Sequence, residues 1–135
     1  MKYKIYVNKH LLVDVLEGTI ILPDLDRLFR QEVSDPDFKF VNSVLSDISN
    51  AHLNVSIDEV QKFANILVST DKDIPLRWAI LTSEPKQTAM SFLLKQNEIF
   101  TNIVGVFTTL EACNQFLEQS IDKQCFYEED YIVLS

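Results

Sequence analysis

The chain has 135 residues, of which 47% are hydrophobic and 24% charged, and this composition is typical of a single globular domain over residues 1–135. Twenty acidic and twelve basic residues give a net charge of −8, which argues against binding to nucleic acid or to an anionic membrane. Two glycines and four prolines are too few for collagen-like repeats or glycine-rich phosphate loops.

The N-terminal segment predicts a β-hairpin. Residues 2–7 alternate between polar and apolar, which is typical of a half-buried strand. Asn8-Lys9 suits a two-residue turn because asparagine tolerates a positive φ, and residues 10–17 continue as the second strand. We therefore expect two antiparallel strands followed by Gly18.

A helix and a buried strand are expected next. Pro23 suits the first turn of a helix, where its missing N–H group has no partner to lose. Asp35-Pro36 ends this helix, because the residue before a proline avoids the α conformation. Residues 40–48 are rich in Val, Leu and Ile and predict a buried strand. The apolar residues at helical spacing are Leu25, Leu28, Phe29 and Val33.

The second half of the chain alternates between helices and strands. Ser56-Ile57-Asp58-Glu59 and Thr108-Thr109-Leu110-Glu111 are both capping-box patterns, so we expect a helix to begin at each. A third helix begins at Ser83-Glu84-Pro85, and Ala89, Met90, Leu93 and Leu94 are expected to face inward from it. Residues 76–81 and 103–107 are short apolar strands.

The order of these elements predicts an α/β fold. An N-terminal antiparallel hairpin is followed by βα repeats, which favour right-handed crossovers and parallel pairing. We expect a mixed, mostly parallel sheet of about five strands covered by four helices. Residues 122–135 are expected to add a C-terminal edge strand or to form a tail.

The cysteines and the N-terminus predict a cytoplasmic location. Cys113 and Cys125 are too few for a disulfide framework, and Cys113 falls on an apolar helical stripe. Residues 1–7 lack the long apolar core of a signal peptide, and no apolar run has the length that spans a bilayer.

Several motifs together resemble a known superfamily. In chain order they are the hairpin with Gly18, Asp35-Pro36-Asp37-Phe38, Asp47, Ser56, Arg77-Trp78-Ala79-Ile80-Leu81, Val106-Phe107 and Leu110-Glu111-Ala112. The pattern is similar to small bacterial proteins of the STAS-like superfamily, which includes anti-sigma-factor antagonists and CRAL-TRIO-type lipid carriers. The resemblance reaches to about Leu117 and implies a STAS-like fold for that part of the chain.

The resemblance implies a phosphoacceptor at Ser56. Anti-sigma-factor antagonists carry an Asp-Ser-Ser-Gly signature where the second helix begins, and its second serine accepts phosphate from a partner kinase. The matching residues here are Asn54-Val55-Ser56-Ile57, so this serine is kept while the other three positions differ. The residues alone give another interpretation, in which Ser56 is a plain helix N-cap.

Polar residues follow the predicted strands at one edge of the sheet. Ligands bind outside the carboxyl ends of the strands in open α/β sheets, so these residues form our predicted ligand or partner site. The alternative is that they are caps and turn formers that the chain needs in any case. The site residues are Asp47, Ser49, Asn50, Asn54, Ser56, Thr82, Ser83, Glu84 and Thr108.

Three functions fit these patterns. The first is a non-enzymatic regulatory or protein-interaction domain that docks to an unknown protein partner or to itself as a homodimer. The second is a carrier of a small apolar molecule, and the third is an enzyme that uses acids at the strand ends. Residues that could line a carrier's pocket, or simply fill the core, are Phe38, Phe40, Phe63, Phe92, Phe100, Phe107 and Phe116.

We expect no cofactor and no metal. His10 in the hairpin turn and His52 in a loop are predicted to be surface residues, since their spacing suggests neither a metal site nor a catalytic triad. Paired acids at Asp24-Asp26 and Asp35-Asp37 lie near predicted helix ends, where carboxylates favour the helix dipole.

Overall fold

The alternating N-terminal segment forms a hairpin in the computed structural model, which describes residues 1–69 and 74–134. β1 (Lys2–Tyr6) pairs antiparallel with β2 (Leu11–Ile20). The predicted two-residue turn at Asn8-Lys9 is wrong. A 3₁₀ turn over Val7–Lys9 joins the strands, and His10 takes the left-handed conformation with φ 52°. The exposed His10 ring is 2.9 Å from the Phe40 carbonyl oxygen.

The remaining strands build one mixed sheet in the order β5-β4-β3-β2-β1-β6. β3 (Ser43–Leu53), β4 (Arg77–Leu81) and β5 (Val104–Phe107) continue from β2 in parallel, as the βα repeats predict. β6 (Ile132–Val133) pairs antiparallel with β1. The predicted α/β class is confirmed, and in the part of the chain that the structure describes the sheet has six strands, where the sequence predicted about five.

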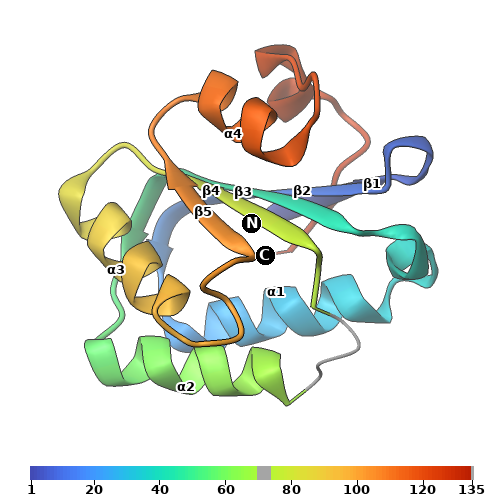
Figure 1. Cartoon of the computed structure of the whole chain (residues 1–135). Helices are drawn as coiled ribbons and strands as arrows, with labels where there is room; N and C mark the ends of the chain where they lie inside the picture. The colour runs from blue at the N-terminus through green and yellow to red at the C-terminus, as the bar shows by residue number, and fades with distance from the viewer. Residues whose placement is uncertain (70–73, 135) are drawn as a thin grey trace.

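Within residues 1–69 and 74–134, four α-helices cover the two faces of this sheet, as Figure 1 shows by their placement. α1 (Leu22–Ser34), α2 (Ile57–Val68) and α3 (Pro85–Lys95) lie on one face, the lower one in the figure. α4 (Leu110–Leu117) lies on the opposite face together with the C-terminal segment. We call these the α1–α3 face and the α4 face.

Strand alternation divides the core between the two faces. On β2, Leu12 and Leu16 belong to the α1–α3 face, while Leu11, Val13 and Val15 belong to the α4 face. The pleat explains this division, because successive side chains point to opposite sides of a sheet. Asp14 therefore points to the α1–α3 face, where only 4% of its surface is exposed.

The central strand β3 differs from the predicted residues 40–48 at both ends. Phe40 belongs to a 3₁₀ turn over Pro36–Phe40, so the strand starts later. It also runs on beside β2 to Leu53, so that His52 lies on an exposed strand position rather than in a loop. The register changes between Asp47, opposite Val15, and Asn50, opposite Glu17.

This change of register is a β-bulge with one extra residue on β3. A bulge moves the following side chains to the other face of the sheet. Val44 before the bulge and Ile48 within it pack on the α1–α3 face, and Ala51 and Leu53 after it pack on the same face. The bulge therefore keeps a long strand apolar towards three helices.

The helix starts agree with the predicted caps at all but one position. The Ser56 hydroxyl accepts from the Glu59 N–H at 3.2 Å, and Glu59 accepts from the Ser56 N–H at 3.0 Å. At α4 the predicted capping box from Thr108 to Glu111 is wrong, because Thr109 is the N-cap and accepts from the Ala112 N–H at 3.1 Å.

The inward face of α3 also differs from the expectation. Ala89 is exposed, while Gln87, Ser91 and Leu94 are the buried residues of this helix. Two of these three side chains are polar, so the apolar stripe of α3 is weaker than the sequence pattern suggested.

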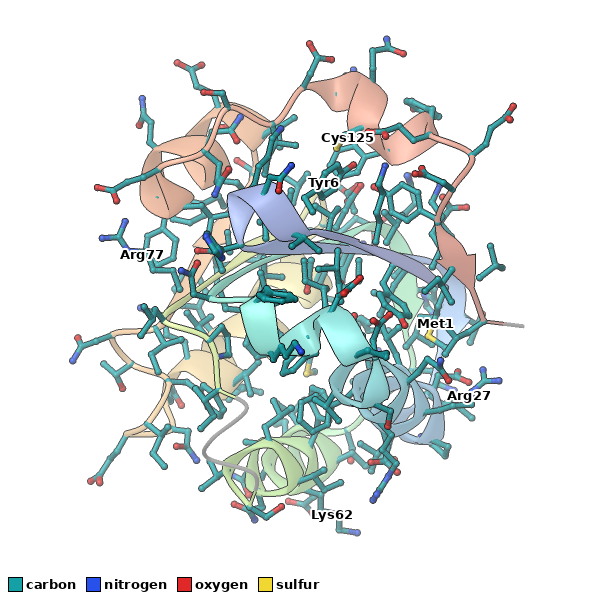
Figure 2. All side chains as sticks on the ribbon, turned by 90° about the vertical axis from the view of Figure 1, so that its right-hand side faces the viewer. Met1, Tyr6, Arg27, Lys62, Arg77 and Cys125 are labelled. Atoms are coloured by element: carbon teal, nitrogen blue, oxygen red, sulfur yellow. The ribbon has the colours of Figure 1, made fainter. Side chains whose placement is uncertain are left out.

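The C-terminal segment packs against the hairpin. The Lys4 ammonium donates to Glu128 at 2.6 Å and to Asp130 at 2.8 Å, and β6 covers the outer side of β1. Figure 2 shows Tyr6 of the hairpin close to Cys125 of this segment. β6 therefore covers the outer edge of the hairpin, and β5 and β6 are the edge strands of the sheet within the described residues.

Candidate functional site

Part of the predicted site does assemble where β3, β4 and α3 meet. The Ser83 hydroxyl donates to the Ser49 carbonyl oxygen at 2.6 Å. The Thr82 hydroxyl lies 2.9 Å from that of Thr88, and the Thr82 N–H donates to the Phe107 carbonyl oxygen at 2.8 Å. These polar groups therefore link neighbouring strands and the start of α3.

Gln87, which the sequence analysis did not select, holds this cluster together. Its side chain is buried, and the amide oxygen accepts from the N–H groups of Ser83 and Glu84 at 2.8 and 3.1 Å. Its amide nitrogen donates to the carbonyl oxygens of Ser49 and Ala51 at 3.2 and 2.8 Å. All four hydrogen-bonding positions of this side chain are used within the protein.

Asp47 lies at the β3 bulge and is 7% exposed. One carboxylate oxygen accepts from the Ser49 N–H at 3.0 Å and from the Ser49 hydroxyl at 2.6 Å. Its negative charge contributes to the environment of Cys113 on α4, where burial first and then this charge raise the pKa of the thiol to about 12. Asp47 thus stabilises the bulge on the α4 face.

The other predicted site residues have local contacts. Asn50 is an exposed residue of β3, opposite Glu17 on β2, and the Asn54 N–H donates to the Ile20 carbonyl oxygen at 2.8 Å. Ser56 caps α2, and Thr108 is an exposed residue directly after β5. A ligand or partner role for this edge, and phosphate transfer to Ser56, stay predictions.

A cavity of about 140 Å³ lies on the α1–α3 face, between the sheet and the three helices. Its lining is almost entirely apolar, and the polar side chains in it are Asp14, Glu32, Ser46 and Ser91. Of the phenylalanines selected from the sequence, Phe38, Phe63 and Phe100 line this cavity, together with Phe29, which was not selected.

The remaining selected phenylalanines lie elsewhere. Phe40 and Phe92 are 40% and 46% exposed, while Phe107 and Phe116 pack on the α4 face with their ring centroids 5.3 Å apart. Only part of the predicted apolar set is therefore available to a ligand.

Asp14 from β2 and Glu32 from α1 form a buried carboxyl pair in the cavity wall. They are 4% and 7% exposed, and a hydrogen bond joins their side chains. Asp14 Oδ1 and Glu32 Oε2 are fully buried and accept no hydrogen bond from an N–H or hydroxyl group of the described residues, which leaves the proton between the two carboxyls as their available donor. A buried acceptor without a partner destabilises a fold by roughly 1–3 kcal/mol, so such atoms call for an explanation.

Burial controls the protonation of this pair. It raises the pKa of Asp14, and the hydrogen bonds with Glu32 and Ser46 offset part of that rise. It raises the pKa of Glu32 well above the ordinary value, and the negative charge of Asp14 raises it further. A hydrogen bond between two carboxyls requires a proton on one of them, so we infer that the pair shares a proton, and the marked rise in the pKa of Glu32 favours this residue as its holder.

Both serines of the cavity wall are used in hydrogen bonds. The Trp78 indole N–H donates to the Ser46 hydroxyl oxygen at 2.9 Å, and the Ser91 hydroxyl donates to the Gln87 carbonyl oxygen at 2.8 Å. The Trp78 ring meets Phe100 edge-on with a centroid separation of 6.1 Å. Trp78 is thus a partly buried residue of the cavity wall.

Neither carboxyl was predicted as a site residue, although each one stands out in the sequence. Asp14 interrupts the run Leu11-Leu12-Val13 and Val15-Leu16 on a strand that is buried on both faces. Glu32 stands on the helical stripe of Leu25, Leu28 and Phe29, where an apolar residue is expected. A charged residue therefore occupies a core position in each of two consecutive elements, β2 and α1, and this pattern could have indicated the carboxyl pair.

Within residues 1–69 and 74–134, no three His, Cys, Asp or Glu side chains are grouped so that they could hold a metal ion. None of the helices in that same part of the chain has both the length and the apolar character needed to cross a bilayer.

No known protein family matches the chain, and no curated protein matches it in sequence. Among solved structures, it is similar to an uncharacterized protein from the DUF3478 family with a SpoIIAA-like fold from Shewanella loihica PV-4. The TM-score is 0.56 at 14% sequence identity, and the match covers 79% of this chain and 83% of that chain. The chain has a STAS-like fold. At this level of identity the similarity concerns the fold alone, and it agrees with the superfamily that the sequence motifs resemble.

Proposed function

We propose that this STAS-like domain is a non-enzymatic binding protein that holds a small, largely apolar molecule in the cavity on its α1–α3 face. The observation that carries this proposal is the cavity itself, an apolar space of about 140 Å³ with the carboxyl pair Asp14 and Glu32 among its lining residues. Ligand sites are typically apolar hollows with a few well-placed polar groups, and this cavity has that character.

The cavity volume limits the ligand. An apolar protein cavity of about 150 Å³ accommodates a benzene molecule, so a single ring or a short alkyl chain fits here. The hydroxyls of Ser46 and Ser91 are already used in hydrogen bonds, so neither is positioned as an activated nucleophile. These features favour binding over chemistry on the bound molecule.

Trp78 provides the test, because it lines the cavity and is the single tryptophan of the chain. Toluene should change the intrinsic fluorescence saturably. Ser91→Leu extends a buried side chain into the cavity and should weaken toluene binding by about tenfold or more. Gln61→Leu, which adds a leucine at an exposed position of α2, should bind like the wild type. If toluene does not bind the wild type, or binds Ser91→Leu equally well, the proposal is wrong.

A second candidate is the protein-interaction role implied by the superfamily, here as a homodimer. The edge strand β6 exposes Ile132 by 43% and Val133 by 72%, and an exposed strand edge can pair with a second copy of the chain. Light scattering should then give a dimer for the wild type and a monomer for Val133→Asp. Leu76→Asp is the matched control, since Leu76 is also 72% exposed but lies before β4. A monomeric wild type would contradict this candidate.

A further inference from the structure

We propose that the cavity selects ligands that carry an amine, whose ammonium group binds between Asp14 and Glu32 while its apolar body fills the space between the sheet and α1, α2 and α3. This inference rests on the proposed function and specifies the chemistry of the ligand. Cavity size and apolar lining alone would admit any small hydrocarbon, so the carboxyl pair is what adds selectivity.

The first step is hydrogen bonding, which favours an amine once the pair is ionised. Asp14 Oδ1 and Glu32 Oε2 accept no hydrogen bond from an N–H or hydroxyl group of the described residues, so they lose their donor when the shared carboxyl proton leaves, and both residues line the cavity. An ammonium group has three N–H donors and no acceptor, so one such group can satisfy both oxygens. A hydrocarbon satisfies neither, and a carboxylate brings only further acceptors.

The second step is charge. The described lining of the cavity includes Asp14 and Glu32 and no cationic side chain, so an anionic ligand would enter against like charge. A cation is attracted to the ionised pair across a short distance in a water-poor space. The net charge of −8 on the whole chain also raises the concentration of cations near its surface. Together these features select against fatty acids and for amines.

The third step is proton exchange. When the ammonium group binds, the shared proton of the pair is released to solvent, so the two carboxylates then hold one cation instead of one proton. Amine binding should therefore tighten between pH 5 and pH 8.

The titratable groups near the pair from other elements are few. Asp47 on β3 acts on Asp14 through its charge, and Glu32 acts in the same way on Tyr3 of β1. Burial, and then the hydrogen bond with Asp35, raise the pKa of Tyr3 to about 12, so this phenol stays protonated over that pH range. No His, Lys or Cys is among the described residues that line the cavity.

Three probes of one ring size separate the possibilities. Toluene, benzylamine and benzoate share the apolar body and differ in carrying no charge, a positive charge or a negative charge. With Trp78 fluorescence at pH 8, we expect benzylamine to bind the wild type at least about tenfold more tightly than toluene, and benzoate to bind more weakly than both.

Glu32→Gln and Asp14→Asn replace each carboxyl by an amide of the same shape and should remove most of the benzylamine advantage while leaving toluene binding in place. Glu17→Gln removes the same charge from an exposed position of β2 and should behave like the wild type. If either cavity variant does not fold, the wild type still tests the inference through its binding of the three probes and through the pH dependence of benzylamine binding.

The outcomes are distinguishable from a failure of the proposed function. Toluene binding without a benzylamine advantage, or with an equal advantage in Glu32→Gln and Asp14→Asn, overturns the amine inference and leaves the proposed function standing. Benzoate as the tightest probe also overturns it. If none of the three probes binds, the proposed function fails and the amine inference fails with it.

Discussion

Two buried aspartates on neighbouring strands, Asp14 and Asp47, behave very differently. They are 4% and 7% exposed. Asp14 on β2 lies opposite Ser46 on β3, and the next residue along β2, Val15, lies opposite Asp47. Asp47 points to the α4 face and accepts two hydrogen bonds from Ser49. Asp14 points to the α1–α3 face, where its Oδ1 accepts no hydrogen bond from an N–H or hydroxyl group of the described residues.

The difference shows how burial should be interpreted for a charged residue. The Asp47 carboxylate is explained by the backbone it stabilises, because the β3 bulge would otherwise leave the Ser49 N–H without its partner. The Asp14 carboxyl has no comparable structural role, and it faces a cavity with a second carboxyl beside it. We therefore expect Asp47 to contribute to stability, and Asp14 and Glu32 to reduce stability in exchange for binding.

The largest expected effect is a loss of stability on the α4 face. Asp47→Ala removes both hydrogen bonds to Ser49 at the bulge and should lower the free energy of unfolding by about 2 kcal/mol, as measured by urea denaturation. Asp47→Asn keeps one acceptor oxygen and should lose about half as much. Equal stability of Asp47→Ala and the wild type would remove the contrast between the two aspartates.

On the α1–α3 face we expect a substitution to raise the free energy of unfolding instead of lowering it. The pKa of Glu32 is raised in the folded chain, so its contribution to stability is fully present below the ordinary carboxyl pKa and is lost as the pH rises through the raised value. Glu32→Gln has no titratable carboxyl at this position, so it does not lose stability in this way as the pH rises. At pH 8 it should be more stable than the wild type by about 1 kcal/mol, and its stability should change less with pH.

Urea denaturation at pH 5 and pH 8 checks this sign, with Glu17→Gln as the exposed control on β2. If Glu32→Gln is less stable than the wild type at pH 8, the carboxyl pair has a structural role and the contrast with Asp47 disappears.

A smaller effect on stability is expected at the N-terminus of α4. Thr109 caps α4 through its hydroxyl, whereas Thr108 next to it is exposed and is not the N-cap. Thr109→Ala should lower the free energy of unfolding by about 1 kcal/mol, and Thr108→Ala by a few tenths at most. If Thr108→Ala is the more destabilising of the two in thermal or urea denaturation, Thr108 is the N-cap, as the predicted capping box required.

The fold could be predicted from the sequence because its signals are local and agree with one another. Pro23 and Pro36 mark the limits of α1, Ser56 and Glu59 cap α2 reciprocally, and the βα alternation determines the parallel order of the sheet. The turn at His10 and the bulge after Asp47 were missed, because both depend on how β2 and β3 pair and not on local sequence preferences.

The candidate site was harder to predict for a physical reason. Asp14 and Glu32 lie 18 positions apart in the sequence (32 − 14), on a strand and on a helix, and only their packing brings the two carboxyls together. Whether a buried polar atom has a partner depends on that packing, as the contrast with Asp47 shows. The predicted polar edge at Ser49 and Ser83 was visible because such residues cluster after strands, yet its side chains are used in contacts with the protein itself.

Carbon-13 NMR of the Asp14 and Glu32 carboxyl groups, recorded at pH 7 with and without benzylamine, tests the central claim most directly. The expected spectrum without benzylamine has a protonated Glu32 carboxyl that titrates well above the ordinary range, and saturating benzylamine converts this group to the ionised form. A Glu32 carboxyl that is already ionised at pH 7 and does not respond to benzylamine would contradict both the shared proton and the amine site.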